Sequence, residues 1–360
     1  MTGRVTTWIA RIFAALAVAA AVAWFSSRDL RYAASAAVEH LRLMAARRPI
    51  QEVIDEPETS AEVREKLRLV SAVRRFASDV LALPDNGSYT TYVEVGRPEL
   101  AWNVFATPEF SIQPLEWCFP VAGCVVYRGY SSEREAREFA SSLSEQGHDT
   151  YVSGVTAYST LGWLDDSVLS TFIGRGAEDL AAIVFHELAH ARLYVPGDSA
   201  FNESFATTVE REGMRRWLRS QGRQEALERV VAARRQREAR VRLMLLTREA
   251  LGGLFSSEAS PDEKRRRKSE LLDDLRLALC VMAGDCKEGE PRRSASRDAE
   301  PLNNAYLVAV GTYHTYVPGF EALLATSDGD LRRFYKSAKE LGELSPEERK
   351  AYLLGEAEQP

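Results

Sequence analysis

The segment FHELAHARLYVPGDSAFNESFA, residues 185–206, carries the pattern on which the predicted architecture depends. His186 and His190 are four residues apart, and Glu187 directly follows the first histidine. The stretch 177–194 lacks glycine and proline, and a Pro-Gly pair follows it after one residue, so the sequence predicts a single helix there. Residues four apart share one face of a helix, so both imidazoles can reach the same point in space.

A catalytic zinc site needs three protein ligands and one open position. The chain leaves the predicted helix near Tyr194, passes through VPGDSAFN and enters a second helical stretch that contains Glu203. At roughly 3.3 Å per residue, this connection is long enough to return past one helical turn to His190. We therefore predict that His186, His190 and Glu203 bind Zn²⁺. The alternative is an ordinary helix that contains two histidines.

The neighbouring acidic and amide side chains receive roles from their spacing. Glu187 borders the histidine face and can reach a water molecule at the metal, so we predict that it acts as the general base. Glu210 lies two turns after Glu203 on the same predicted helix, and Asn202 precedes that glutamate; either can orient a ligand. Asp198 or Ser199 is the expected N-cap of this helix.

A distant segment, GTYHTY at 311–316, is the candidate source of a further donor. Hydrolysis of an amide requires a group that stabilises the developing oxyanion. We assign this role to Tyr313, with His314 as the second choice. Aromatic packing between helices is the alternative for both residues.

Composition and charge limit the classes of function. The 360-residue chain is 45% hydrophobic, which is enough for a substantial core. Its formal net charge is −6, which argues against a nucleic-acid partner. The basic run KRRRK at 264–268 is surrounded by acidic residues, so we interpret it as a solvated surface.

The N-terminal segment predicts export. Arg4 and Arg11 precede an apolar run from Ile12 to Phe25, as in a secretory signal, so residues 1–27 are either a signal peptide or an uncleaved N-terminal membrane anchor. The expected location is the periplasm of a double-membraned bacterium, with inner-membrane attachment if the segment is retained.

Export changes the interpretation of the four cysteines. They form two local pairs with the same spacing, Cys118 with Cys124 and Cys280 with Cys286. In an oxidising compartment each pair can close a disulfide loop, whereas buried free thiols are the alternative. The spacing is wider than that of a structural zinc knuckle.

Periodicity predicts an α+β fold that is mainly helical, with a small β-sheet packed beside the zinc-binding helix. Residues 28–82 have helical spacing of apolar residues, 89–172 alternate as short strands around one helix at 132–147, and 177–360 are helical again. The three segments are expected to form one domain, residues 28–360.

Several separate motifs resemble one known family. These are HELAHARLYVPGDSAFNESFATTVEREG (186–213), TPEF (107–110), CFPVAGCVVYRGY (118–130), STLGWLDDSVLST (159–171) and NNAYLVAVGTYHTYVPGF (303–320). Together they are similar to the bacterial predicted aminopeptidases. The resemblance implies a gluzincin-type zinc metallopeptidase in which His186, His190 and Glu203 bind the metal and Glu187 is catalytic. Many members carry a lipoprotein cysteine near the N-terminus, and this chain has none before Cys118.

The expected substrate is a peptide, which in this class of enzyme binds as an added strand beside the active-site helix. SGVTAYSTLGW, residues 153–163, is the candidate edge. Asp165 and Asp166 can bind a free substrate amine, which would favour an aminopeptidase, or can form a turn. A non-catalytic zinc-containing scaffold tethered to the membrane and a zinc hydrolase of a non-peptide amide remain alternatives; the number of subunits is left open.

Overall fold

The structure, a computed structural model, describes residues 28–119, 123–157, 165–286 and 302–356. Its described part is mainly helical and contains small sheets, which confirms the predicted α+β class. The predicted leader, residues 1–27, lies outside the described residues. The helices are α2 (Arg28–Ala45), α3 (Ile50–Asp55), α4 (Ala61–Asp79), α5 (Glu133–Ser144), α6 (Ser170–Ile173), α7 (Ala177–Arg192), α8 (Ser199–Ser220), α9 (Gln224–Ser256), α10 (Pro261–Ala283), α11 (Asn304–His314), α12 (Val317–Thr326), α13 (Leu331–Gly342) and α14 (Pro346–Leu353). The strands are β1 (Arg48–Pro49), β2 (Thr91–Val93), β3 (Ala101–Pro108), β4 (Trp117–Phe119), β5 (Gly123–Val125), β6 (Arg128–Tyr130), β7 (His148–Val155) and β8 (Val168–Leu169).

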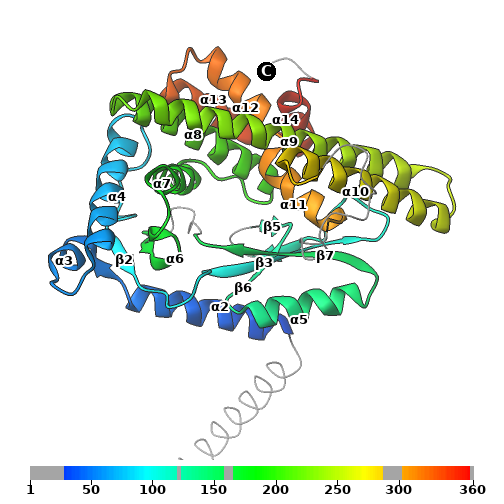
Figure 1. Ribbon diagram of the computed structural model, residues 1–360, viewed down its shortest axis with the longest axis horizontal. Coiled ribbons are helices and arrows are strands. Elements are labelled where there is room, and N and C mark those ends of the chain that lie inside the picture. Colours follow the sequence, from blue (N-terminus) through cyan, green and yellow to red (C-terminus); the bar gives the residue numbers. More distant parts are fainter. Residues whose placement is uncertain (1–27, 120–122, 158–164, 287–301, 357–360) are drawn as a thin grey trace, which may run out of the picture.

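The sheet beside α7 and α11 has the strand order β6-β3-β7, with both pairs antiparallel. Successive residues of a strand point to opposite faces. Val104 and Ala106 of β3 accordingly pack in a cluster with α5, whereas Phe105 packs with Ala305 and Ala309 of α11. Figure 1 shows the sheet between α5 on one side and α11 on the other.

The sequence pattern predicts one small sheet in the strand-rich region, whereas the structure contains more than one. β2 belongs to a second sheet of order β1-β2-β8, and β4 and β5 form a separate hairpin. β2 pairs antiparallel with β1 and parallel with β8. These partners precede it and follow it by more than 40 residues, and a local pattern carries no information about such a distant pairing.

Helix α7 lies in the main core. Its N-terminal turns pack against α4, and its buried apolar face includes Leu180, Val184, Phe185 and Leu188. The helix ends at Arg192, two residues before the predicted end, because Leu193 already has an extended backbone with φ −149° and ψ 127°.

Helix α8 crosses α7 and continues the same core. Phe201 and Phe205 contact Phe320 of α12, and Phe205 also stacks on Phe334 of α13. Two turns after Phe205, the buried carboxylate of Glu212 accepts hydrogen bonds from two arginines of its own helix, Arg215 and Arg216. The aromatic contacts hold α8 against α12 and α13, whereas the bonds of Glu212 lie within α8 itself.

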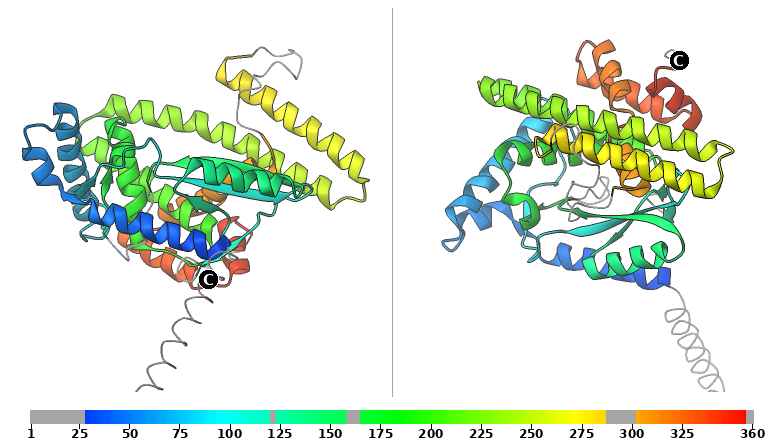
Figure 2. Two further views of the ribbon diagram at one scale, coloured as in Figure 1. Left: turned by 90° about the horizontal axis from the view of Figure 1, so that it is seen from below. Right: turned by 45° about the vertical axis from the view of Figure 1, so that its right-hand side comes forward.

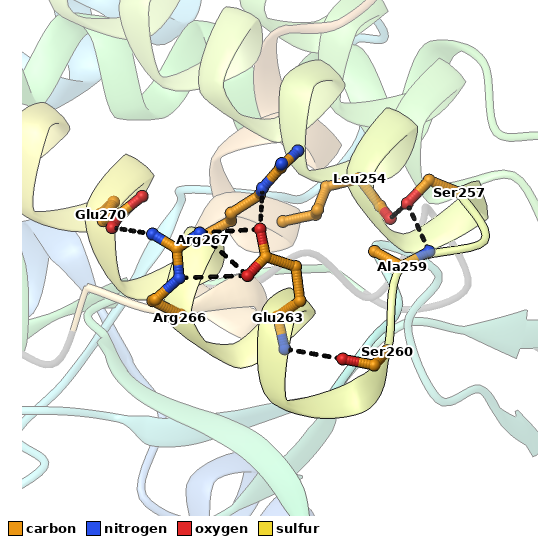
Figure 3. Close-up of polar contacts among 8 residues, drawn as sticks. All are labelled: Leu254, Ser257, Ala259, Ser260, Glu263, Arg266, Arg267 and Glu270. Atoms are coloured by element: carbon orange, nitrogen blue, oxygen red, sulfur yellow. Dashed lines mark hydrogen bonds and ion pairs between the residues drawn. The ribbon is translucent and has the colours of Figure 1, made fainter.

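Helices α9 and α10 form a long antiparallel pair that extends along one side of the molecule (Figure 2). The turn between them is followed by an N-cap in which Ser260 accepts a hydrogen bond from the backbone N–H of Glu263 (Figure 3). Arg266 and Arg267 form ion pairs with the Glu263 carboxylate, as the surface interpretation of KRRRK predicts. Lys268 is the exception, because it is buried and bonded to Asp149 at 2.6 Å.

Both predicted cysteine pairs are disulfides. Cys118–Cys124 closes the β4–β5 hairpin, and Cys280–Cys286 lies at the C-terminal end of α10. Among the described helices, none combines the length and the apolar character needed to cross a bilayer.

Candidate metal centre

Helix α7 presents the two histidines to one side of the core. The rings of His186 and His190 lie one turn apart, with centroids separated by 5.0 Å. Their side chains are 16% and 8% exposed, respectively. The helical spacing therefore produces the pair of buried imidazoles that the sequence predicts.

Glu203, in the second turn of α8, completes a group of three possible ligands. Its Oε2 lies 3.3 Å from Nε2 of His186 and 3.8 Å from Nε2 of His190. The three ligand atoms lie within 4.8 Å of one another, and the Glu203 side chain is 13% exposed. Two imidazole nitrogens and one carboxylate oxygen form a donor set that suits a divalent metal ion.

The connection between α7 and α8 is held by specific contacts. Asn202 binds the backbone of Val195 twice: its Oδ1 accepts from the N–H at 2.7 Å, and its Nδ2 donates to the carbonyl at 2.8 Å. Asp198 is the N-cap of α8 and accepts from the N–H of Phe201. Asn202 therefore orients the connecting loop; the predicted contact with a histidine or with Glu203 is not among its hydrogen bonds.

The β4–β5 hairpin supports the same connection from outside. Gly123 has φ +74°, and a Cβ placed there would lie 2.7 Å from the backbone nitrogen of Gly197. Gly197 itself has φ +81°. The disulfide-closed hairpin thus touches the backbone of the short segment that joins the helix of the two histidines to the helix of Glu203.

Glu210 orients one of the two histidines. Its Oε2 lies 3.1 Å from Nδ1 of His186, a distance at which the ring N–H donates to the carboxylate. A proton on Nδ1 leaves Nε2, the nitrogen nearest Glu203, with a lone pair for a metal. Nδ1 of His190 is buried and has no hydrogen-bond partner among the described residues. The expected orienting role of Glu210 therefore applies to His186.

Burial and neighbouring charges set the protonation of the ligands. Burial lowers the pKa of His190 to about 4, so its ring is neutral at pH 7. Burial acts to raise the pKa of Glu203, but the two histidines outweigh it and the net pKa is lowered. Burial opposes a charge on His186, yet its bonds to Glu203 and Glu210 raise its pKa well above the usual value. A neutral imidazole and an ionised carboxylate fit a cation, and binding displaces a proton from His186.

Glu187 lies beside the three possible ligands, and its pKa is raised whereas that of Glu203 is lowered. Burial raises its pKa to about 7, the nearby His186 lowers it, and the carboxylates of Glu203 and Asp166 raise it further. A carboxyl group with a pKa near neutrality can both accept and release a proton. This is the property required of the base that the sequence predicts at this position.

The site lies between two cavities. The first has a volume of about 490 Å³ and the second of about 540 Å³, and both are lined by Asn103, Val155, Ala157, His186, Glu187 and Tyr313. The first continues towards α2, β3 and β6, and the second towards β7, α9 and α11. The two histidines, Glu187 and Glu203 all line the first cavity, whereas the second contains His186 and Glu187.

The two candidates from the GTYHTY segment differ in position. Tyr313 lines both cavities; the proximity of Glu203 and burial raise its pKa well above 10, so its phenol is protonated and can donate a hydrogen bond. His314 lines only the second cavity of the two, and burial together with Arg211 and Arg237 lowers its pKa to about 4. The geometry therefore favours Tyr313 over His314 as the residue beside the ligands.

Asp165 and Asp166 lie outside both cavities. The backbone carbonyl of Asp165 accepts a hydrogen bond from Arg47, and the Asp166 backbone bonds to Ser88 and Tyr89. Neither is among the described residues that line the two cavities, so the cavities give no support to a role in binding the substrate amine, and neither residue lies in a turn. The carboxylate of Asp166 does act on Glu187 by raising its pKa.

Most lining residues were not predicted from the sequence, and three polar ones illustrate why. Tyr127 and Tyr194 line the first cavity, and Asn103 lines both. Tyr194 stands four residues after His190 but lies beyond the end of α7 at Arg192, so helical spacing does not explain its position. Tyr127 and Asn103 come from the strand region, where no local motif distinguishes them.

Comparison with known proteins adds one match. A family model described as "Putative aminopeptidase" matches residues 31–353, and no curated protein or solved structure matches the chain. The match spans α2 to α14 and includes every residue of the site described above. The chain therefore belongs to this aminopeptidase family.

Proposed function

We propose that the protein is a zinc metallopeptidase, and specifically an aminopeptidase, whose metal ion is held by His186, His190 and Glu203. The proposal rests above all on the convergence of these three side chains, all at most 16% exposed, beside Glu187. Zinc is favoured because two imidazoles and one carboxylate are a common catalytic zinc set. When bound, the metal supplies Lewis acidity, which polarises a carbonyl group and makes water a stronger acid.

The other side chains of the site have separate tasks in this proposal. Glu187 takes a proton from the attacking water and passes it to the leaving amine, and its pKa of about 7 suits both transfers. Tyr313 donates its O–H to the oxyanion that develops from the scissile carbonyl. Glu210 keeps the His186 ring oriented through its bond to Nδ1.

The peptide is proposed to lie across the sheet face that the two cavities share. β7 is an edge strand of its sheet within the described residues, and Ser153, Gly154 and Val155 line the second cavity. An edge strand offers backbone hydrogen bonds to an extended peptide. The C-terminal part of the predicted edge, residues 158–163, lies outside the described residues.

The charge of the first cavity supports the aminopeptidase assignment. Its acidic lining residues are Glu39, which forms an ion pair with Arg97, the proposed base Glu187 and the proposed ligand Glu203, and its described lining contains no lysine or arginine. Glu39 is the carboxylate outside the metal centre, and we propose that it attracts the ammonium group of a peptide's N-terminus in competition with Arg97. The remaining lining is largely apolar or aromatic, and includes Leu43, Leu100 and Val125, so the first residue of the substrate is proposed to be apolar.

Export of the chain to the periplasm, with or without a retained membrane anchor, is part of the same proposal. Two disulfides support it, because such bonds persist in oxidising compartments.

Metal content and peptide hydrolysis test the proposal together. Purified without chelators, the wild type is expected to contain about one zinc per chain and to cleave peptides with a free amino terminus. Glu187→Gln should retain zinc and lose about 10²-fold to 10⁴-fold in kcat, the usual contribution of a general base. Glu203→Ala should lose both, while Glu228→Gln, an exposed change on α9, should match the wild type.

Three results would contradict the proposal. A wild type that contains no zinc and gains none on addition would refute the metal centre. Zinc with cleavage of non-peptide amides alone would replace the peptidase by another zinc hydrolase, and zinc without any hydrolysis would favour the scaffold.

A further inference from the structure

The two cavities differ in charge. Arginine lines the second cavity at two positions, Arg175 and Arg237, whereas the described lining of the first has neither arginine nor lysine. The acidic members of the second cavity are Asp179, Glu187 and Glu210. The Glu210 carboxylate is bonded to His186, and Glu187 lies among the ligands. The second cavity therefore contains two arginines in addition to the acidic residues that it shares with, or has next to, the possible metal centre.

Both arginines are available to a ligand. Arg175 lies just before α7, is exposed, and its Nη2 donates a long 3.4 Å hydrogen bond to Oγ1 of Thr156. Arg237 is exposed on α9. Among the described residues, no acidic side chain forms an ion pair with either arginine. Several other arginines of α8 and α9 are paired, such as Arg211 and Arg234, which both contact Glu321.

The two guanidinium groups come from separate parts of the chain. Arg175 follows α6, and Arg237 lies in the middle of α9, yet one cavity joins them to His186, Glu187 and Tyr313. A guanidinium binds a carboxylate through two parallel hydrogen bonds. The volume of about 540 Å³ falls within the range of small-ligand sites.

We propose that the second cavity binds the carboxyl-terminal side of the substrate, and that Arg175 and Arg237 recognise a carboxylate there. This inference rests on the proposed peptidase function and names its substrate class: short peptides whose carboxylate lies within one or two residues of the cleaved bond. The polarity follows from charge, because the carboxylate end is attracted to the two arginines of the second cavity, and the ammonium end then lies in the first cavity, whose described lining has neither arginine nor lysine. The carboxylate belongs either to the free C-terminus or to an acidic side chain.

Three matched substrates separate the two sources of the carboxylate. The dipeptide Leu-Ala has a free C-terminal carboxylate, Leu-Ala amide has none, and Leu-Glu amide carries one only on its side chain. We expect kcat/KM for Leu-Ala to exceed that for Leu-Ala amide by about tenfold to a hundredfold, the effect of a hydrogen bond to a charged group. A preference for Leu-Glu amide over Leu-Ala amide would assign the site to an acidic side chain.

Arginine variants test whether the second cavity causes the preference for a carboxylate. Arg237→Gln and Arg175→Gln should each lower kcat/KM for Leu-Ala towards that for Leu-Ala amide and leave the amide unchanged. Arg235→Gln is the matched control, because Arg235 is exposed on the same helix and outside both cavity linings. Equal kcat/KM for all three substrates in the wild type, or a preference that survives both substitutions, would overturn the inference.

A binding measurement keeps the inference distinct from the peptidase proposal. Calorimetric titration of the Glu187→Gln variant with Leu-Ala and with Leu-Ala amide compares their affinities without turnover. Tighter binding of Leu-Ala that is lost in Arg237→Gln supports the carboxylate site even if no peptide is cleaved. Equal binding of the two ligands would refute the site, even in an active peptidase.

Discussion

Glu210 provides the sharpest test of the metal centre, because it contacts one ligand and need not touch the metal. Its Oε2 lies 3.1 Å from Nδ1 of His186, whereas Nδ1 of His190 has no such partner among the described residues. Loss of a partner of this kind typically lowers metal affinity by about 10-fold to 100-fold, which corresponds to about 1.4 to 2.7 kcal/mol. We expect the loss of metal affinity in Glu210→Ala to be near the upper limit of this range. Glu210→Gln should lie near the lower limit, because its amide oxygen can still accept the bond.

The effect should depend on pH in a defined direction. In the metal-free protein, Glu203 and Glu210 together raise the pKa of His186 well above its usual value, so a proton competes with the metal. Removal of Glu210 weakens this competition, which offsets part of the lost affinity at neutral pH. As the pH rises the proton is lost from the wild type as well, so the ratio of variant to wild-type Kd should increase.

Competition with a zinc-binding dye across this pH range measures the ratio directly. Glu228→Ala, an exposed glutamate on α9, is the control and should leave the Kd of zinc unchanged. If Glu210→Ala binds zinc with wild-type affinity at every pH, the bond to His186 does not orient a ligand and the reasoning is wrong.

Three further predictions concern the framework around the site. Gly123→Ala should weaken zinc binding and lower stability, because its Cβ would meet backbone of the α7–α8 connection at 2.7 Å. Gly96→Ala, which has a similar φ of +73° but open space around it, should lower stability only through backbone strain. Zinc titration and thermal melting compare the two variants. Burial raises the pKa of Glu212, but its two arginine partners outweigh burial and lower it below 4.5. Its stabilising effect is therefore complete above the unfolded pKa and lost as pH falls through the folded pKa. The stability gap between wild type and Glu212→Gln in urea unfolding should shrink on acidification; a constant gap would contradict this. Gly213→Ala would bring its Cβ to 2.8 Å from core side-chain atoms and should destabilise by about 1 kcal/mol, whereas Gly253→Ala, exposed on α9 with nothing within 4 Å, should stabilise by about 0.5 to 1 kcal/mol; equal melting temperatures of the two variants would be inconsistent with the packing.

Local patterns predicted the parts of the site that lie close together in sequence. The four-residue spacing placed His186 and His190 on one face of α7. Glu203 follows after a short connection, which keeps its carboxylate near the two imidazoles. Glu210 was within reach because seven residues are about two turns of the same helix. The helix end was predicted two residues late, because extended backbone near a proline depends on contacts such as that between Asn202 and Val195.

The sequence by itself determined the helical class of the chain, the pair of histidines with their glutamates, and the pairing of neighbouring cysteines, because each depends on residues within about two dozen positions. Only the tertiary structure decided which distant groups share the site: Tyr313 beside the ligands, Asn103 between the cavities, and Arg175 with Arg237 in one cavity. It also decided that Lys268 is buried and forms an ion pair with Asp149, whereas the neighbouring arginines are not buried. The physical reason is that packing between elements more than 50 residues apart is set by the shapes and charges of whole surfaces, and no local periodicity records them.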